Sequence, residues 1–242
     1  HGEELTVKQS DVKLTGWAIE GRVYAEDPYR GFLPSIGRLA RYIPPVEQPG
    51  VRVDTGVMEG GEISMYYDPM IAKLVTFGDS RAEAIDRMRK ALDAFYITGV
   101  SHNLPFLASL LAKGRFVDGN LTTNFIPEEY PDGFSQADLP PEDPMIPVVV
   151  AAFAHRKSAD RNAHMTGQIA GHEVPYQHDW VVTLGDVDYP VTVHALRDGY
   201  EVVTGDGISH QVISDWHMGQ PLFFATINGK PVCVQITRDG IG

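Results

Sequence analysis

The sequence GVRVD at residues 50–54 and the sequence YYDPMIAKLVTF at residues 66–77 decide the fold of the first half of the chain. Side chains alternate between the two faces of a β-strand, so the two valines of the first segment share one face and Arg52 points to the other. A turn at Gly60-Gly61 leads to a second strand at residues 71–77. We therefore predict two strands here, the first carrying Arg52 on the face opposite its valines.

Further elements are predicted on both sides of this stretch. Residues 16–24 and 38–43 are predicted strands, the first because apolar side chains alternate there with polar or small ones. Ser80 and Glu83 have the spacing of a helix capping box, and apolar residues recur after them at helical intervals. Mixed strands and helices of this kind are typical of an α+β unit.

Glycines set the expected ends of the helices in this half. We predict that the first helix ends at Gly99 and that a second one covers residues 103–113, up to Gly114. Residues 1–134 are then one domain. A proline-rich acidic linker is predicted at residues 135–144, ahead of a second domain at residues 145–242.

The second domain begins with an unusual helix. Asp143-Pro144 is suited to cap a helix that runs from Met145 to about Asp160. Residues 148–154 are apolar on every face, and such a helix has to be surrounded by other structure. After a polar loop at residues 161–179, short alternating strands separated by glycine-containing turns are predicted at residues 180–184, 187–193, 200–203, 208–213, 222–227 and 231–236. We expect an antiparallel, barrel-like sheet with the helix at its centre.

Composition excludes several classes of function. The formal net charge of −12 and the lack of clustered Lys and Arg argue against nucleic-acid binding. The longest apolar run, at residues 145–154, is too short to span a bilayer, so we expect no membrane partner. The one cysteine, Cys233, cannot form an internal disulfide, which suits a reducing compartment. The first residues have neither the basic nor the apolar region of a signal peptide.

Four motifs together resemble the C-terminal subdomain of biotin carboxylases: VYAEDP at residues 23–28, FLPSIG at 32–37, GVRVD at 50–54 and YYDPMIAK at 66–73. In that family the ATP-grasp nucleotide site and the bicarbonate site precede this region. The resemblance therefore implies that ATP, Mg²⁺ and bicarbonate are bound by residues upstream of His1.

The resemblance gives Arg52 a catalytic and biotin-binding role. In the family the matching arginine lies against the ureido oxygen of biotin and stabilises the enolate that forms when N1 loses its proton. Arginine suits this because it stays charged and presents a rigid planar set of donors. Taken alone, an Arg two residues before Asp54 on a strand is more often a surface or salt-bridged side chain.

A further motif indicates which group of carboxylases within this family the chain resembles most. EYPDGF at residues 129–134 is similar to propionyl-CoA carboxylase α subunits, more than to methylcrotonyl- or acetyl-CoA carboxylases, which are the alternatives. The second half is similar to the domain that joins biotin carboxylase to the carboxyltransferase. The implied partners are a carboxyltransferase β subunit and a biotinyl carrier domain in a hetero-oligomer, in bacterial cytosol or the mitochondrial matrix. Biotin would be carried on a domain absent from this chain, and a non-catalytic assembly module is the alternative for the chain alone.

Three other groups of residues were weighed as functional sites. Glu26 and Asp27 could be paired carboxylates, but Asp-Pro is more often a turn or cap element. The histidine spacings in the 161–179 loop match no zinc motif, so no metal site is predicted. That loop is too long for an ordinary connection, and we expect it to contact the carboxyltransferase. Its candidate interface residues are His164, Met165, His172, Tyr176 and His178.

We predict that the purified chain will not hydrolyse ATP in the presence of bicarbonate and free biotin. The reason is that the sequence has neither a glycine-rich phosphate-binding fingerprint nor a Walker motif. A coupled assay for ADP release, run beside a complete biotin carboxylase, checks this. Biotin-dependent ATP turnover by the chain would contradict it.

Overall fold

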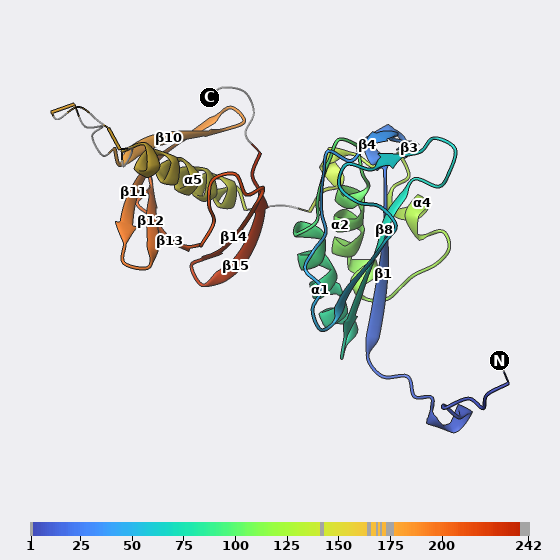
Figure 1. Ribbon diagram of the computed structural model, residues 1–242. Helices are drawn as coiled ribbons and strands as arrows, with labels where there is room; N and C mark the ends of the chain where they lie inside the picture. Colours follow the sequence, from blue (N-terminus) through green and yellow to red (C-terminus); the bar gives the residue numbers. More distant parts are fainter. Residues whose placement is uncertain are drawn as a thin grey trace. The chain divides into compact units, whose positions relative to one another are not determined.

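The computed structural model describes residues 2–140, 143–163, 166–167, 169, 171–172 and 177–237 (Figure 1). The chain divides into two compact units, residues 1–140 and residues 141–242. Each has a hydrophobic core of its own.

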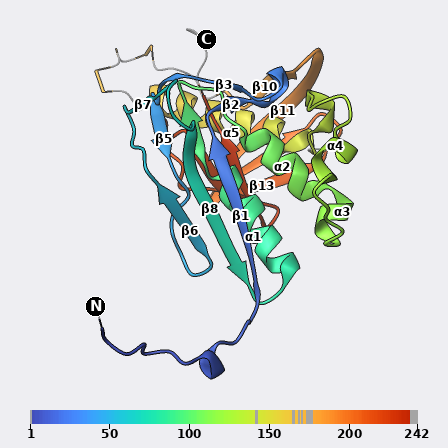
Figure 2. The same cartoon turned by 90° about the vertical axis from the view of Figure 1, so that its right-hand side faces the viewer.

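A three-stranded antiparallel sheet organises the first unit. Strands β1 (Trp17–Tyr24), β8 (Met70–Gly78) and β6 (Val51–Thr55) lie in the order β1-β8-β6 (Figure 2). Helix α1 (Arg81–Asp93) covers one face of this sheet. The predicted strands at residues 16–24, 50–54 and 71–77 are therefore confirmed.

The core of the first unit forms between the sheet and α1. Val23, Leu74 and Phe95 have no solvent exposure, and Met88 of α1 is 1% exposed. Burying side chains of this size stabilises a fold by about 1.5–3 kcal/mol each. The alternation along the strands places one face of the sheet in this core.

The N-terminus of α1 matches its sequence signal closely. The hydroxyl of Ser80 accepts a hydrogen bond from the Glu83 N–H at 3.2 Å. The Glu83 carboxylate accepts from the N–H of Asp79 at 2.8 Å, one residue before the position that a reciprocal capping box uses. Both contacts satisfy backbone donors near the start of the helix.

The predicted end of α1 at Gly99 is wrong. The helix ends at Asp93, and strand β9 (Tyr96–Thr98) pairs with β5 (Arg41–Ile43). Gly99 follows β9 with a φ of +99°, where a Cβ atom would lie 2.2 Å from the Arg38 carbonyl oxygen. The glycine is needed for this close backbone approach and not as a helix stop.

The predicted strand at residues 38–43 is divided between two partners. Arg38 belongs to β4 (Gly37–Arg38), which pairs with β7 (Glu62–Ile63), whereas β5 pairs with β9. A third short pair joins β2 (Glu26–Asp27) to β3 (Leu33–Pro34).

Several helical turns complete the first unit. Helix α2 (Leu104–Ala112) confirms the second predicted helix. Gly114 begins a further helix, α3 (Gly114–Val117), and α4 (Phe125–Glu129) follows. Short 3₁₀ turns occupy η1 (Gln9–Asp11), η2 (Pro28–Arg30) and η3 (Gln136–Asp138).

The first part of the predicted linker is attached to the first unit. The Ser109 hydroxyl donates to the Asp138 carbonyl oxygen at 2.6 Å and lies 2.9 Å from the Tyr130 hydroxyl. Phe106, Tyr130 and Phe134 pack their rings together, with centroids 5.3–5.9 Å apart. Residues up to Asp138 are thus held against α2.

The second unit is a helix enclosed on one side by a curved sheet (Figure 1). Helix α5 (Met145–Ala163) begins after Asp143, whose carboxylate accepts from the Met145 N–H at 2.9 Å. Six antiparallel strands follow in sequence order as a half-barrel. They are β10 (Asp179–Leu184), β11 (Val187–Leu196), β12 (Gly199–Thr204), β13 (Ser209–Ile213), β14 (Leu222–Ile227) and β15 (Lys230–Gln235).

Helix α5 fills the concave face of this sheet, as its all-round apolar surface predicts. Val148, Val149 and Phe153 have no solvent exposure. Phe153 packs edge-on against Phe223 of β14 at 5.2 Å between ring centroids. The helix continues to Ala163, beyond the predicted end at Asp160, so the following loop is shorter than expected.

No helix in the described ranges combines the length and the hydropathy that a membrane crossing requires.

Asn103 joins α2 to the sheet. This residue is 6% exposed, and its side chain accepts from the Tyr24 N–H at 2.9 Å and donates to the Arg22 carbonyl oxygen at 3.0 Å. The pairing of β1 with β8 shifts register at this point, between Val23 and Tyr24. The amide of Asn103 therefore satisfies backbone groups beside the irregularity.

We predict that Asn103→Ala lowers the free energy of unfolding by about 2–3 kcal/mol, because two backbone groups of β1 lose their partner. Urea denaturation measures this. The matched control is Asn120→Ala at an exposed position, expected to change stability by about 0.5 kcal/mol or less. Equal stability of the two variants would contradict the role of Asn103.

Candidate functional site

Arg52 lies on the solvent face of the three-stranded sheet. Val51 beside it is 7% exposed, whereas the Arg52 side chain is 66% exposed. The guanidinium Nη2 donates to Asp54 Oδ2 at 3.0 Å, on the same face of β6. An exposed pair of this kind contributes about 1 kcal/mol or less to stability. Arg52 is therefore not required by the core.

Charged residues continue across this face of the sheet. Asp54 lies opposite Lys73 of β8, and Lys73 lies opposite Arg22 of β1. Arg22 forms its own ion pair with Glu20 at 3.0 Å. The solvent face of the sheet thus carries three cations and two carboxylates in neighbouring positions.

A groove of about 830 Å³ lies along β6, β8 and the connection between them, and its lining includes Asp54, the ion-pair partner of Arg52, but not Arg52 itself. Its polar lining includes Asp54, Lys73 and Asp68, and Tyr67 on its rim is 83% exposed. This concave surface carries polar groups of both signs, which can orient a polar ligand. It has no glycine-rich loop of the kind that binds phosphates.

The Glu26-Asp27 pair has the structural role predicted as its alternative. The Asp27 carboxylate accepts from the Tyr29 N–H at 3.1 Å and caps η2. Partial burial, and then the nearby charge of Asp68, raises the pKa of Glu26. Asp27 is thus engaged as a cap, beside a half-buried Glu26.

No group of three His, Cys, Asp or Glu side chains in the described part of the chain is arranged to hold a metal ion.

The predicted interface loop connects Ala163 of α5 to Asp179 of β10. Arg161, which the prediction placed in the loop, belongs to the helix. Three of the five candidate residues lie outside the described residues: His164, Met165 and Tyr176. His172 is exposed, and its N–H donates to the Ile169 carbonyl oxygen at 3.0 Å.

The fifth candidate, His178, is tied to the body of the domain. Its Nδ1 lies 3.0 Å from Nη1 of Arg156, a buried residue of α5. Sequence reasoning missed Arg156. The sequence does contain a signal for a buried ion pair, because Arg156 interrupts an apolar helix and Asp160 follows four residues later.

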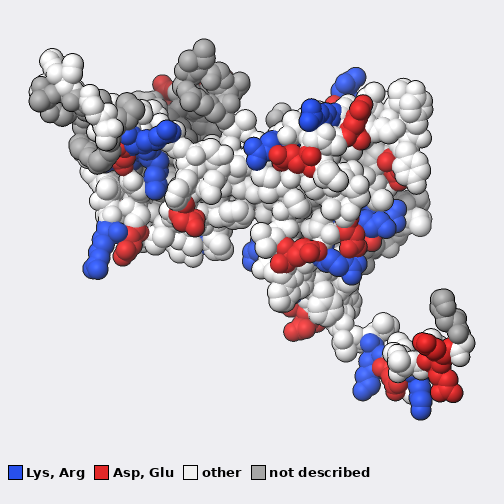
Figure 3. Space-filling model, viewed as in Figure 1, with Lys and Arg blue, Asp and Glu red and all other residues white. Residues whose placement is uncertain are grey.

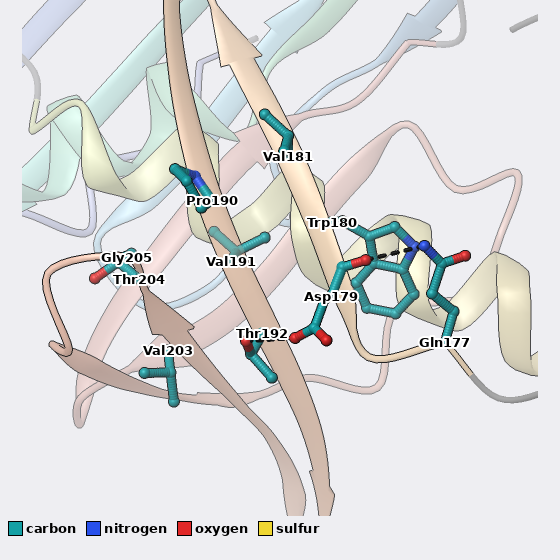
Figure 4. Close-up of a pocket in the computed structure, with 10 residues that line it drawn as sticks. All are labelled: Gln177, Asp179, Trp180, Val181, Pro190, Val191, Thr192, Val203, Thr204 and Gly205. Atoms are coloured by element: carbon teal, nitrogen blue, oxygen red, sulfur yellow. Dashed lines mark hydrogen bonds between the residues drawn. The ribbon is translucent and has the colours of Figure 1, made fainter.

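A second groove, of about 560 Å³, lies on the outer face of β10, β11 and β12 (Figure 4). Val181, Pro190 and Val203 supply an apolar lining. The Asp179 carboxylate at its edge already accepts from the Thr192 hydroxyl at 2.7 Å. The groove therefore lacks the converging free polar groups of a catalytic pocket.

Charges of both signs are interspersed on the face drawn in Figure 3, and no broad basic area is visible on that face. A phosphate backbone requires clustered cations. The arrangement on this face therefore does not favour nucleic acid.

Comparison with known families identifies both units. The biotin carboxylase C-terminal domain matches residues 20–128, and the propionyl-coenzyme A carboxylase BT domain matches residues 148–242. The chain therefore belongs to the biotin carboxylase family. The combination of these two domains identifies it as a fragment of a propionyl-CoA carboxylase alpha chain.

Propionyl-CoA carboxylase alpha chains are similar to it throughout. The Ruegeria pomeroyi protein is 48% identical over 98% of this chain and 38% of its own length. The mitochondrial protein of Rattus norvegicus is 41% identical over 100% of this chain and 33% of its own length. The chain thus spans about a third of the length of these curated relatives.

A solved structure matches part of the chain. It is the biotin carboxylase domain dimer of Hydrogenobacter thermophilus 2-oxoglutarate carboxylase, in complex with MgADP, ADP and bicarbonate. The TM-score is 0.51 and the identity 41%, over 53% of this chain and 28% of that one.

Proposed function

We propose that the chain forms part of an α subunit that carboxylates protein-bound biotin with ATP and bicarbonate and delivers it to a propionyl-CoA carboxyltransferase. The observation that carries this is the match of both domains, in order, to propionyl-CoA carboxylase alpha chains. The first domain alone is similar to a 2-oxoglutarate carboxylase, so it supports only the biotin carboxylase class. The BT domain favours propionyl-CoA over the methylcrotonyl- and acetyl-CoA alternatives.

Arg52 is the catalytic residue of this proposal. Its guanidinium is exposed, pairs with Asp54 of the groove lining and is not needed for packing, which supports a role at the ureido oxygen of biotin. A fixed cation at that oxygen favours the enolate that forms when N1 is deprotonated. Biotin supplies the nucleophilic nitrogen when bound, and Arg52 supplies the positive charge.

The nucleotide belongs elsewhere in the proposed enzyme. The related carboxylase was solved with MgADP and bicarbonate, which supports ATP, Mg²⁺ and bicarbonate as reactants. The groove along β6 and β8 has no phosphate-binding loop, and we assign these reactants to residues outside this chain. Relatives named as mitochondrial support the mitochondrial matrix as the compartment of a eukaryotic version, with the cytosol for a bacterial one.

The BT domain is proposed to bind the carboxyltransferase β subunit through the 164–178 loop. The loop joins the enclosed helix to an edge strand of the sheet, and His172 and Ile169 within it are exposed. Apolar and aromatic side chains on an exposed loop are typical interface anchors. The biotinyl carrier domain would be the second partner, meeting the first domain at Arg52.

We predict that Arg52→Ala, in an α subunit that contains this chain, lowers the kcat of biotin carboxylation by about 100- to 1,000-fold. The KM for ATP should stay nearly constant, because the charge acts where the enolate develops and not at the nucleotide. Initial rates at varied ATP and biotin measure both constants.

The control for this experiment is the folding stability of the Arg52→Ala variant. Arg52→Ala should change the free energy of unfolding by about 0.5 kcal/mol or less, since the side chain lies outside the core. Arg41→Ala, which also removes an exposed ion pair, is the matched variant and should keep normal turnover. An unchanged kcat in Arg52→Ala would remove Arg52 from the mechanism.

We also predict that a Gly/Ser linker in place of residues 164–177, which keeps His178 and its contact with Arg156, leaves the half-barrel folded but abolishes co-purification with the β subunit. Circular dichroism and Trp216 fluorescence check the fold, because Trp216 is buried in the core of this unit. Normal affinity for the β subunit after the replacement would place the contact elsewhere on the domain.

A further inference from the structure

Strand β6 lies at the edge of its sheet, so β8 supports it from one side only. The turn at residues 47–50 folds back along the other side. The Val51 N–H donates to the Gln48 carbonyl oxygen at 2.8 Å, and the Val53 N–H donates to the Glu47 carboxylate at 3.1 Å. Two backbone donors on the free edge of β6 are therefore satisfied by this turn.

Arg87 of α1 reaches the point where this turn meets β8. Its Nη1 donates to the Phe77 carbonyl oxygen at 2.7 Å and lies 3.5 Å from the Pro49 carbonyl oxygen. Its Nη2 donates to the Glu83 carboxylate, one turn earlier in the helix. The Phe77 N–H in turn donates to the Gly50 carbonyl oxygen at 2.9 Å. One side chain thus joins α1, the end of β8 and the turn before β6.

Gly50 leaves the space that the guanidinium occupies. A Cβ atom at residue 50 would lie 1.8 Å from Arg87 Nη1 and 2.8 Å from the Phe77 carbonyl oxygen, and the φ of Gly50 is +86°. A side chain there would be strained and would displace Arg87. The approach of the guanidinium to this backbone therefore depends on a glycine immediately before β6.

The ion pair in this cluster does not explain the arrangement by its stability. The side chains of Arg87 and Glu83 are 34% and 37% exposed, and pairs of this kind contribute about 1 kcal/mol or less. What arginine adds is geometry, because its planar fork fixes several acceptors relative to one another. Here the fork faces two carbonyl oxygens at the junction of β6 and β8, so it sets where β6 begins relative to the sheet.

We propose that Arg87 is a positioning residue for Arg52. It holds the turn that leads into β6, and β6 presents the Arg52 guanidinium two residues after Gly50. This inference rests on the proposed role of Arg52 at biotin. Rates are sensitive to placement, since a shift of about 1 Å can cost about 100-fold. Arg87 acts through the backbone and not by contact with biotin.

The first measurement is hydrogen exchange in an α subunit that contains this chain. In Arg87→Met, amides of β6 should exchange about tenfold faster, because the turn on its free edge loses an anchor. Residues 20–24 of β1 pair with the part of β8 far from Phe77, and their exchange should stay normal. Unchanged exchange in β6 would overturn the proposal.

Arg89 provides the matched control. It lies on the same helix, and its Nη2 donates to the Leu111 carbonyl oxygen of α2 at 2.5 Å. Arg89→Met removes the same type of contact at a place that does not involve β6. It should leave both turnover and the exchange of β6 unchanged. An equal increase in β6 exchange in both variants would mean that any loosening of α1 has this effect, which also overturns the proposal.

The second measurement is a double-mutant cycle on turnover. With Arg52 present, Arg87→Met should lower the kcat of biotin carboxylation about tenfold and leave the KM for ATP nearly constant. In the Arg52→Ala background, the same substitution should have no further effect on kcat. A tenfold loss in both backgrounds would mean that Arg87 does not act through Arg52.

The two proposals fail in different ways. If Arg52→Ala keeps a normal kcat, the catalytic role of Arg52 is wrong, and the positioning role of Arg87 falls with it. If Arg52→Ala loses activity but Arg87→Met turns over normally despite faster exchange in β6, the role of Arg52 stands. In that case only the positioning role of Arg87 is overturned.

Discussion

The two-residue alternation of side chains along β6 and β8 is the constraint on which the first unit depends. It places Val51 and Leu74 in the core against α1 and, by the same geometry, Arg52 and Asp54 in solvent. Packing therefore fixes the direction of Arg52 without using its charge. A shift of one residue in register would exchange core and solvent faces, so fold and site cannot vary independently here.

The second unit solves a different packing problem. A helix with apolar residues all round has to be enclosed, and the six-stranded half-barrel supplies the enclosure. Within the apolar part of α5 the exposed positions are Ala151 and His155, one helical turn apart, and Arg161 and Asn162 are exposed near its end. Arg156 follows within this apolar setting, and its guanidinium lies within hydrogen-bond distance of Asp160, of His178 and of the Val193 carbonyl oxygen.

Much of the fold was predictable because its signals are local. The capping pattern at Ser80, the alternation at residues 50–54 and the turns between the later strands each act over a few residues. The misassigned end at Gly99 arose because that glycine serves a contact with the Arg38 backbone, 61 positions away in sequence numbering. The short helices α3 and α4 carry too few apolar residues for a periodic signal.

The sequence by itself determined the family motifs, the two-domain order, and Arg52 on the face of a strand opposite its valines. Only the tertiary structure decided which charges meet. It paired Arg52 with Asp54, made Asp27 a cap and not half of a carboxylate pair, and brought Arg156 to His178 across 22 positions. The physical reason is that strand period and capping act between near neighbours, whereas the partners of a buried charge depend on how separate elements pack.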